Sequence, residues 1–291
     1  MKGSGRNISL TSYDDLFSTE ETRQADAREQ VLQIPLSELH PFKDHPFRVV
    51  DDDRMMETVE SVKEYGVLVP AIARPLGNGG YEIVAGHRRK HGSELAGLSD
   101  MPCIVREMDN DTATILMVDS NIQREDILPS ERAQAYKMKM EALKRQGARS
   151  DLTSPQVASK FRADDEVAKA AGVSGDTVRG FVRLTELQPE LQQMVDDKKI
   201  AMTPAVELSY LKPEEQQMLL TAIDSEQATP SLSQAQRMKK LSQAGKLNDD
   251  TMLDIMMEQK KPEKCELTFS GDVLRKYFPR SYTPQKMEEA L

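Results

Sequence analysis

The sequence has no tryptophan, few other aromatic residues and no long apolar run. Aromatic residues make up 5% of its 291 residues, so any core must be built mainly from aliphatic side chains and methionine. No stretch approaches the roughly 20 consecutive apolar residues of a membrane-spanning helix. The N-terminus leads into polar sequence and not into an apolar signal core. We therefore expect a cytoplasmic protein with no membrane partner.

Cysteine is also scarce, which argues against a disulfide framework and a cysteine-based metal site. The two cysteines, Cys103 and Cys265, lie far apart, and neither has a Cys-x-x-Cys partner. A disulfide is not expected in a reducing compartment. The four histidines show no metal-binding spacing either. We expect Cys103 to lie in a core.

The net charge of -9 argues at first against a nucleic-acid partner, but the charge is unevenly distributed. Residues 132–149 form a locally basic segment, opposed nearby only by Glu131 and Glu141. A locally basic face can bind DNA on an acidic protein, although long-range steering is then weak. Phosphate contacts are therefore expected from Arg132, Lys137, Lys139, Lys144, Arg145 and Arg149.

The length is sufficient for two domains of about 100–150 residues each. Residues 1–30 read as a flexible polar arm, and residues 31–127 read as a mixed α/β domain. In that domain His40-Pro41-Phe42 should break the first strand, and Gly77–Gly80 should turn a hairpin. Strands are expected at residues 31–34, 71–74, 81–85 and 101–106, and helices at 52–65, 86–96 and 111–120.

After Pro129 the pattern is helical almost throughout. Residues 128–230 are expected to form a helical DNA-binding domain, and residues 231–291 a helical tail that could serve oligomerisation. Gly147 should end the first of these helices. The helices are expected at residues 130–146, 155–161, 166–184 (two helices and a turn), 189–197, 204–211, 213–224, 233–244 and 249–259.

The segment EVAKAAGVSGDTVRGFVRL, residues 166–184, predicts a helix-turn-helix. Ala168 is small enough for the helix crossing, Gly172 tolerates a positive φ in the turn, and Ser174 can cap the second helix. The alternative is a plain helical hairpin. In a DNA-binding motif the second helix would present Gly175, Asp176, Thr177, Arg179 and Arg183 outward, and the expected DNA-binding residues are Ser174, Thr177, Arg179 and Arg183.

The segment YEIVAGHRR, residues 81–89, leads from a strand through Gly86 into a helix. Backbone N–H groups at a helix N-terminus favour an anion, and adjacent arginines can clamp phosphate oxygens. Cations in a first helical turn oppose the helix dipole, so His87, Arg88 and Arg89 need an explanation. A bound phosphate supplies one, and a basic, solvated first turn is the alternative.

The segment SNIQREDI, residues 120–127, joins the two parts of the chain. Asn121, Gln123 and Arg124, followed by two acids, combine an amide oxygen, a cation and carboxylates. This mixture could hold a nucleotide phosphate with Mg²⁺, with Asn121 as a ligand of the ion. It could equally be a polar linker with local salt bridges, and the residues alone do not separate these readings.

Together these stretches resemble the ParB/Noc family of chromosome and plasmid partition proteins. The similar segments also include SVKEYGVLVPAIARP (residues 61–75) and LPSERAQAY (residues 128–136), and they follow the family's order from about residue 31 to 211. The chain looks most similar to a sub-branch found beside mobile elements and plasmids in Gram-positive bacteria. The resemblance implies an α+β fold, in which a small ParB/sulfiredoxin-like α/β domain precedes an all-α helix-turn-helix domain.

The resemblance also implies a function. ParB-like proteins bind a palindromic centromere site on double-stranded DNA, bind CTP with Mg²⁺, close as a homodimeric clamp on the nucleoid and work with a ParA-type ATPase. The residues that would bind the nucleotide here are Gly66, Gly86, His87, Arg88, Arg89, Asn121, Gln123 and Arg124.

Two departures from the family put CTP hydrolysis in doubt. The usual acids are replaced by His87 and Ser120, and the usual Gln-Pro-Arg is nearest to His45-Pro46-Phe47-Arg48. One alternative function is therefore a helix-turn-helix transcription regulator with an inactive nucleotide module. Another is a ParB-like nuclease, which would need clustered metal ligands. A sulfiredoxin activity would need a cysteine beside the phosphate loop, and residues 66–92 contain none.

Overall fold

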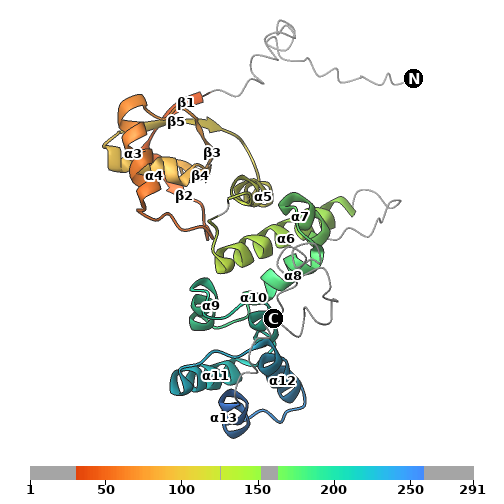
Figure 1. The fold of residues 1–291 in the computed structure, drawn as a ribbon. Coiled ribbons are helices and arrows are strands. Elements are labelled where there is room, and N and C mark those ends of the chain that lie inside the picture. Colours follow the sequence, from red (N-terminus) through yellow and green to blue (C-terminus); the bar gives the residue numbers. More distant parts are fainter. Residues whose placement is uncertain (1–30, 125, 152–162, 259–291) are drawn as a thin grey trace, which may run out of the picture. The chain divides into compact units, whose positions relative to one another are not determined.

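The computed structural model describes residues 31–124, 126–151 and 163–258 (Figure 1). The expected N-terminal arm, the expected helix at residues 155–161 and the last part of the expected tail lie outside these ranges. The described part has a mixed sheet with helices followed by a helical region, which confirms the expected α+β class. No helix in the described ranges has the length and apolarity needed to cross a bilayer.

The N-terminal part is built on a five-stranded mixed sheet with the order β1-β5-β3-β4-β2. The pairs β1–β5 and β3–β4 are antiparallel, and the pairs β3–β5 and β2–β4 are parallel. The expected hairpin is therefore confirmed as β3–β4. The strands are β1 (Val31–Pro35), β2 (Leu39–Pro41), β3 (Ala71–Pro75), β4 (Tyr81–Ala85) and β5 (Asp100–Val105).

Strand β2 corrects the expectation that His40-Pro41-Phe42 breaks the strand pattern. Leu39–Pro41 pairs in parallel with Tyr81, Glu82 and Ile83 of β4. The proline is tolerated because β2 is an edge strand of the sheet. A three-residue strand that depends on a distant partner leaves little periodicity in the sequence.

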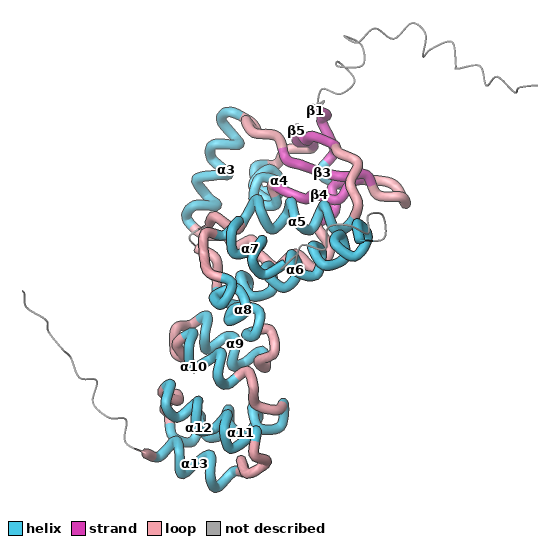
Figure 2. Tube along the Cα trace, turned by 90° about the vertical axis from the view of Figure 1, so that its right-hand side faces the viewer, coloured by secondary structure: helices cyan, strands magenta, loops and turns pink. Residues whose placement is uncertain are grey.

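Three helices accompany the sheet, namely α3 (Asp53–Tyr65), α4 (His87–Ala96) and α5 (Asn110–Asn121). Helix α3 packs against α4, α4 also contacts β3 and β5, and α5 contacts β4. The sheet core contains Cys103, which is fully buried as expected. Figure 2 shows α3 and α4 beside the sheet.

The described residues after the junction are helical, as expected. Helix α6 runs through Gly147, where the sequence suggested an end. Gly147 is not among the glycines with positive φ, and a glycine ends a helix mainly by taking that conformation. The helices are α6 (Pro129–Asp151), α7 (Ala163–Ala171), α8 (Gly175–Leu184), α9 (Pro189–Asp196), α10 (Met202–Leu208), α11 (Pro213–Glu226), α12 (Leu232–Gln243) and α13 (Asp249–Met257).

The helical core continues past residue 230, where a separate tail was expected to begin. Met238 of α12 and Met252 of α13 are almost fully buried in the same apolar cluster as Leu191 of α9 and Leu219 of α11. These methionines complete the core of the preceding helices because they fill its remaining apolar volume. The described part of the expected tail is therefore part of the helical domain.

Candidate functional site

Helix α4 begins at a glycine that no other residue can replace without strain. Gly86 is the N-cap of α4 and has φ 112°, in the left-handed region. A Cβ atom on Gly86 would lie 2.9 Å from the Cβ of Ala71 in the neighbouring strand β3. The glycine therefore allows β4 to turn directly into α4 and fixes the position of the residues that follow.

His87 is a neutral, inward-facing side chain and not part of a cationic cluster. Its ring packs against His45 with 3.8 Å between ring centroids. The Phe42 N–H donates to His87 Nε2 at 3.4 Å, so the ring proton lies on Nδ1. Burial, followed by the neighbouring His45 and Lys90, lowers the pKa of His87 to about 3. The expected cationic first turn is wrong at this position because the loop before α3 covers the ring.

The two arginines after His87 have different partners. Arg88 Nη2 donates to Asp52 Oδ1 at 3.1 Å, and Asp52 is also the N-cap of α3. Arg89 Nη1 donates to the carbonyl oxygens of Val69 and Pro70, both at 2.6 Å. Arg89 thus anchors α4 to the loop after α3, whereas Arg88 remains at the edge of a pocket and can exchange a carboxylate for another anion.

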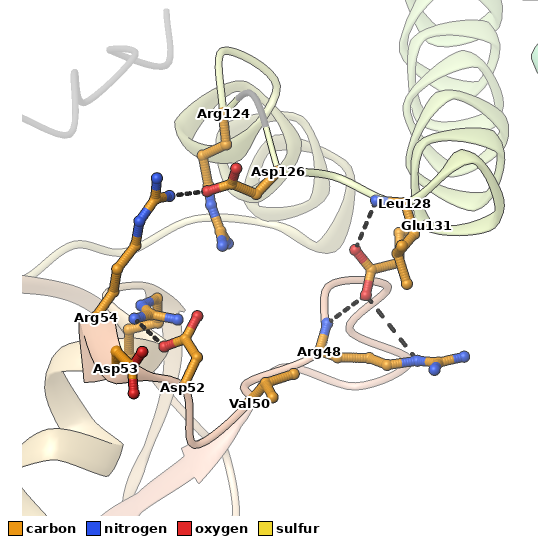
Figure 3. Close-up of a pocket in the computed structure, with 10 residues that line it drawn as sticks. Arg48, Val50, Asp52, Asp53, Arg54, Arg124, Asp126, Leu128 and Glu131 are labelled. Atoms are coloured by element: carbon orange, nitrogen blue, oxygen red, sulfur yellow. Dashed lines mark hydrogen bonds and ion pairs between the residues drawn. The ribbon is translucent and has the colours of Figure 1, made fainter. Parts of the chain in front are cut away.

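That pocket has a volume of about 820 Å³, within the usual range for ligand sites (Figure 3). It lies between the start of α3 and the connection from α5 to α6. Four arginines and four acids line it, and Figure 3 shows Arg54 facing Asp126 on one side and Arg48 facing Glu131 on the other. The pocket is lined by Arg48, Val50, Asp52, Asp53, Arg54, Arg88, Arg124, Asp126, Leu128 and Glu131.

A smaller pocket of about 170 Å³ adjoins it and shares Arg48, Arg88 and Arg124. Six of the eight expected nucleotide-binding residues line this smaller pocket, so the structure brings two distant motifs together. They are Gly86, His87, Arg88, Arg89, Asn121 and Arg124.

The other two expected nucleotide residues lie elsewhere. Gly66 lines a separate pocket, which shares Arg89 with the smaller one. The Gln123 side chain donates to the Ala170 carbonyl at 3.1 Å and does not line either arginine-rich pocket. Its amide ties the end of α5 to α7 in this structure, and its expected nucleotide contact stays a prediction. Conversely, the sequence did not assign a binding role to Arg48, which was noted only as part of His45-Pro46-Phe47-Arg48, or to Arg54, whose acidic neighbours resemble an ordinary solvated helix start.

Asn121 is not arranged as a metal ligand. Its Nδ2 donates to the Met117 carbonyl at 2.9 Å and to Ser120 Oγ at 3.1 Å, while its Oδ1 accepts from Arg124 at 3.5 Å. A guanidinium beside the amide oxygen disfavours a bare cation at the same place. Across the described ranges, no three His, Cys, Asp or Glu residues are grouped to hold a metal ion, such as a nuclease would need.

The helix-turn-helix is confirmed at α7 and α8. Gly172 in the turn has φ 69°, and the Ser174 hydroxyl accepts from the Thr177 N–H at 3.1 Å to cap α8. Ala168 and Val178 are buried between the helices. These contacts fix the direction in which α8 presents its exposed residues Asp176, Thr177 and Arg179. The Ser174 oxygen accepts in this cap and lies 2.9 Å from the Thr177 hydroxyl, and since the cap does not use its own O–H, its expected DNA contact stays a prediction.

Arg183 does not project outward as expected. Its Nε donates to Ser209 Oγ at 3.2 Å, its Nη2 donates to the Ser209 carbonyl, and its guanidinium lies 4.2 Å from the centre of the Tyr210 ring. Lys239 of α12 also lies 3.6 Å from that ring centre. Arg183 therefore braces the last turn of α8 against the helices that follow.

The basic face expected on α6 is largely neutralised within the protein. Lys139 is buried and paired with Asp119, Arg145 pairs with Asp111 at 2.7 Å, and Lys137 lies 3.7 Å from Glu186. Arg132 lies over the Phe181 ring. Lys144 is exposed. Burial withdraws Lys139 from the surface, whereas Arg145 and Lys137 keep 53% and 38% of their side chains exposed, so their expected phosphate contacts stay a prediction.

Comparisons with known proteins agree with this architecture. The family model described as the ParB N-terminal domain matches residues 20–122, and that of the ParB HTH domain matches residues 155–243. A probable chromosome-partitioning protein ParB of Xylella fastidiosa is 33% identical over 186 residues, covering 64% of this chain and 54% of that protein. A nucleoid occlusion protein of Geobacillus thermodenitrificans is 28% identical over 268 residues, covering 90% and 84%.

Solved structures of similar proteins are also found. The C-terminally truncated chromosome-partitioning protein ParB of Caulobacter crescentus complexed to the centromeric parS site has a TM-score of 0.45 and 24% identity, covering 72% of this chain and 98% of that chain. The same protein complexed with CTP-gamma-S has a TM-score of 0.31 and 27% identity, covering 62% and 92%. The chain spans about half the length of the Xylella relative.

Proposed function

We propose that this chain, which matches the ParB N-terminal domain over residues 20–122 and the ParB HTH domain over residues 155–243, is a CTP-regulated, centromere-binding partition protein of the ParB family. Partition by ParB-type DNA binding is the function that its domains share with its chromosome-partitioning relatives. The finer proposal is that the N-terminal domain binds CTP, and that CTP closes a homodimer as a clamp on a palindromic site in double-stranded DNA.

The observation that carries the nucleotide proposal is the convergence of Arg48, Arg88 and Arg124 on two adjoining pockets. Guanidinium groups are well suited to phosphate because they donate several hydrogen bonds in a fixed plane. Arg88 is half-buried and pairs with Asp52 at 3.1 Å, so a phosphate would compete with this carboxylate for the guanidinium. The side chains present therefore fit a triphosphate, whereas the preference for cytidine rests on the family resemblance.

Mg²⁺ would enter this site with the triphosphate, which supplies oxygen ligands of its own. Asn121 would reach the ion only if its oxygen turns away from Arg124. The two positions at which the family carries acids offer no carboxylate, since His87 is a neutral, half-buried imidazole and the Ser120 hydroxyl donates to the Met117 carbonyl at 2.8 Å. We therefore propose that the protein binds CTP and hydrolyses it slowly or not at all.

The remaining parts of the proposal follow from the family. A cytoplasmic, nucleoid-associated protein of this type would act with a ParA-type ATPase. Its place beside mobile elements or plasmids of Gram-positive bacteria is likewise proposed from sequence similarity. The similarity to a nucleoid occlusion protein over 90% of this chain supports a role on the nucleoid.

Calorimetric titration of the full chain with CTP, ATP, GTP and UTP tests the nucleotide proposal, with Mg²⁺ and with or without duplex DNA. CTP should bind selectively, and Arg88→Gln and Arg124→Gln should each weaken binding by roughly tenfold or more because each removes a charge-assisted contact. Lys63→Gln is the matched control, since it removes an exposed cation from α3 outside both pockets.

Two results would contradict this proposal in different ways. Equal binding of all four nucleotides would leave a phosphate pocket without cytidine selectivity. Loss of affinity in Lys63→Gln equal to that in Arg88→Gln would show that only the general charge matters. If no nucleotide binds while DNA binding is intact, the chain is a helix-turn-helix regulator with an inactive nucleotide module.

A further inference from the structure

The outer face of α8 carries one available guanidinium. Helix α8 has two arginines, and Arg183 is held by Ser209 and Tyr210 of the helical domain. Arg179 lies one turn earlier, and 48% of its side chain is exposed. Since α8 is the second helix of the helix-turn-helix, Arg179 lies where such motifs contact base edges.

Arg179 is held between two carboxylates of different character. Its Nη1 donates to Asp164 of α7, and its Nη2 donates to Asp176 of α8. The Asp164 side chain is only 14% exposed, whereas the Asp176 side chain is 90% exposed. Asp164 is therefore a fixed support behind the guanidinium, and Asp176 is a carboxylate on the outer surface beside it.

The first residue of α8 leaves room for this arrangement. A Cβ on Gly175 would lie 3.0 Å from Asp165 Oδ1, which is tighter than nine in ten such contacts, and 3.4 Å from Arg179 Nη1, at van der Waals contact. A side chain here would press on the guanidinium and on the acids of α7. The glycine thus serves the Asp164–Arg179 contact, since its own φ is not positive and the turn does not require it.

We propose that Asp164, Arg179 and Asp176 form a base-reading group that selects G·C pairs in the DNA site. Arginine recognises guanine through O6 and N7, and aspartate accepts from the N4 amino group of cytosine. Arg179 uses two of its five N–H donors on the carboxylates, so three remain for guanine. Asp164 does not touch DNA and acts as a positioning residue.

An exposed carboxylate on a DNA-facing helix supports base reading over phosphate binding. Asp176 would be repelled by the phosphate backbone and gains only where a base offers a donor, as cytosine does. Residues 176 and 179 are three apart on the helix, so their Cβ atoms lie about 5–6 Å from each other. They can therefore read the same or neighbouring base pairs. This inference rests on the DNA-binding role of the helix-turn-helix and is independent of the nucleotide.

Selection from a pool of randomised duplex DNA with the full chain tests the proposal. The wild-type protein should select a site whose half-sites each contain an invariant guanine. A cytosine should occur in the same base pair as that guanine or in the next one. Arg179→Gln should change the preference at that position from guanine to adenine, because glutamine pairs with adenine N6 and N7. Asp176→Asn should likewise change the preference for cytosine to a preference for adenine. Each variant should lose roughly tenfold or more of the original discrimination.

Variants of the supporting residues and the control variant have different expected results. Asp164→Asn and Gly175→Ala should both lower affinity for the wild-type site and keep the same base preference, because they disturb only the orientation of Arg179. Lys169→Gln removes an exposed cation of α7 and should leave the base preference unchanged. A far-UV circular dichroism melt of each variant checks that the helices remain folded.

Failure of the DNA-binding premise and failure of the base-reading proposal give different results. If the wild-type protein selects no sequence from the pool, the DNA-binding premise fails and the assignment fails with it. If it selects a site and Arg179→Gln selects the same one, the base-reading assignment is overturned. It is also overturned if Arg179→Gln weakens all sequences equally and reduces the salt slope by about 1, which is the behaviour of a phosphate contact.

Discussion

Lowering the pH from 7 to 4 should reduce the free energy of unfolding by about 3 kcal/mol through His87 alone. Burial depresses the pKa of His87 from 6.5 to about 3 in the folded protein, so the unfolded chain binds the proton first as the pH falls. The contribution is therefore complete above pH 6.5 and is lost progressively below it. His45 changes in the same direction, mainly by burial, and adds to the effect.

Urea unfolding of the full chain, followed by circular dichroism between pH 7 and 4, measures this loss, since tryptophan is absent. Carboxylates with a lowered pKa, such as Asp52 beside Arg88, begin to lose their contribution below about pH 5, so the loss between pH 7 and 5 reports the histidines. His87→Gln keeps an acceptor for the Phe42 N–H and should flatten the pH dependence.

Nuclear magnetic resonance offers a direct check on the same group. The imidazole C–H signals of His87 should show no titration between pH 7 and 5 in the folded protein. A midpoint near 6.5, or an unchanged acid loss in His87→Gln, would refute the assignment of a neutral, buried ring.

The sequence was sufficient to predict the elements whose turn, capping and core residues lie close together in the chain. The helix-turn-helix depends on the turn at Gly172, the cap at Ser174 and the buried Val178, all within seven residues. The β3–β4 hairpin likewise carries its own glycine turn. Such elements follow from backbone freedom, capping and periodicity, which a sequence shows directly. The edge strand β2 cannot be predicted in this way, because its partner strand β4 lies about 40 residues further along the chain.

The sequence could not predict which charged side chains remain able to contact a ligand. Arg183 and Arg179 are both arginines on α8. Arg183 is hydrogen-bonded to Ser209, 26 residues away in the chain, whereas Arg179 remains on the surface. Arg89 is tied to carbonyls of the preceding loop, and Lys139 to Asp119. A motif fixes which functional groups are near one another in the chain, while tertiary contacts decide which of them face a ligand.

The same distinction explains the nucleotide site. The motifs containing Arg88 and Arg124 are each ambiguous as sequences, since a solvated helix start and a polar linker have similar compositions. The fold places both arginines on the same two pockets and adds Arg48 from a third segment. Gln123 lines neither of these pockets, and its amide bonds to α7. Convergence of three segments on one pocket is the evidence for an anion site that none of them provides alone.

Gly86→Ala should destabilise the protein by about 2–5 kcal/mol, the sum of about 1–2 kcal/mol for a left-handed residue and about 1–3 kcal/mol for overpacking. The overpacking arises because the added Cβ would lie 2.9 Å from the Ala71 Cβ and 3.3 Å from its Cα, which belong to a central strand that cannot move aside. Gly97→Ala is the matched control at the other end of α4. Gly97 has φ 79° and nothing within 4 Å of the added atom, so only the left-handed cost of about 1–2 kcal/mol should appear.

Urea unfolding at pH 7, above the histidine titrations, compares the two variants with the wild-type protein. The difference between them measures how tightly β3 and the start of α4 are packed, and it should be at least about 1 kcal/mol. Equal destabilisation by Gly86→Ala and Gly97→Ala would show that β3 yields to the new methyl group. The turn that carries His87 and Arg88 would then be adaptable, and the arginine pocket would not be preformed. A large difference would mean that the sheet itself holds Arg88 in place before any phosphate binds.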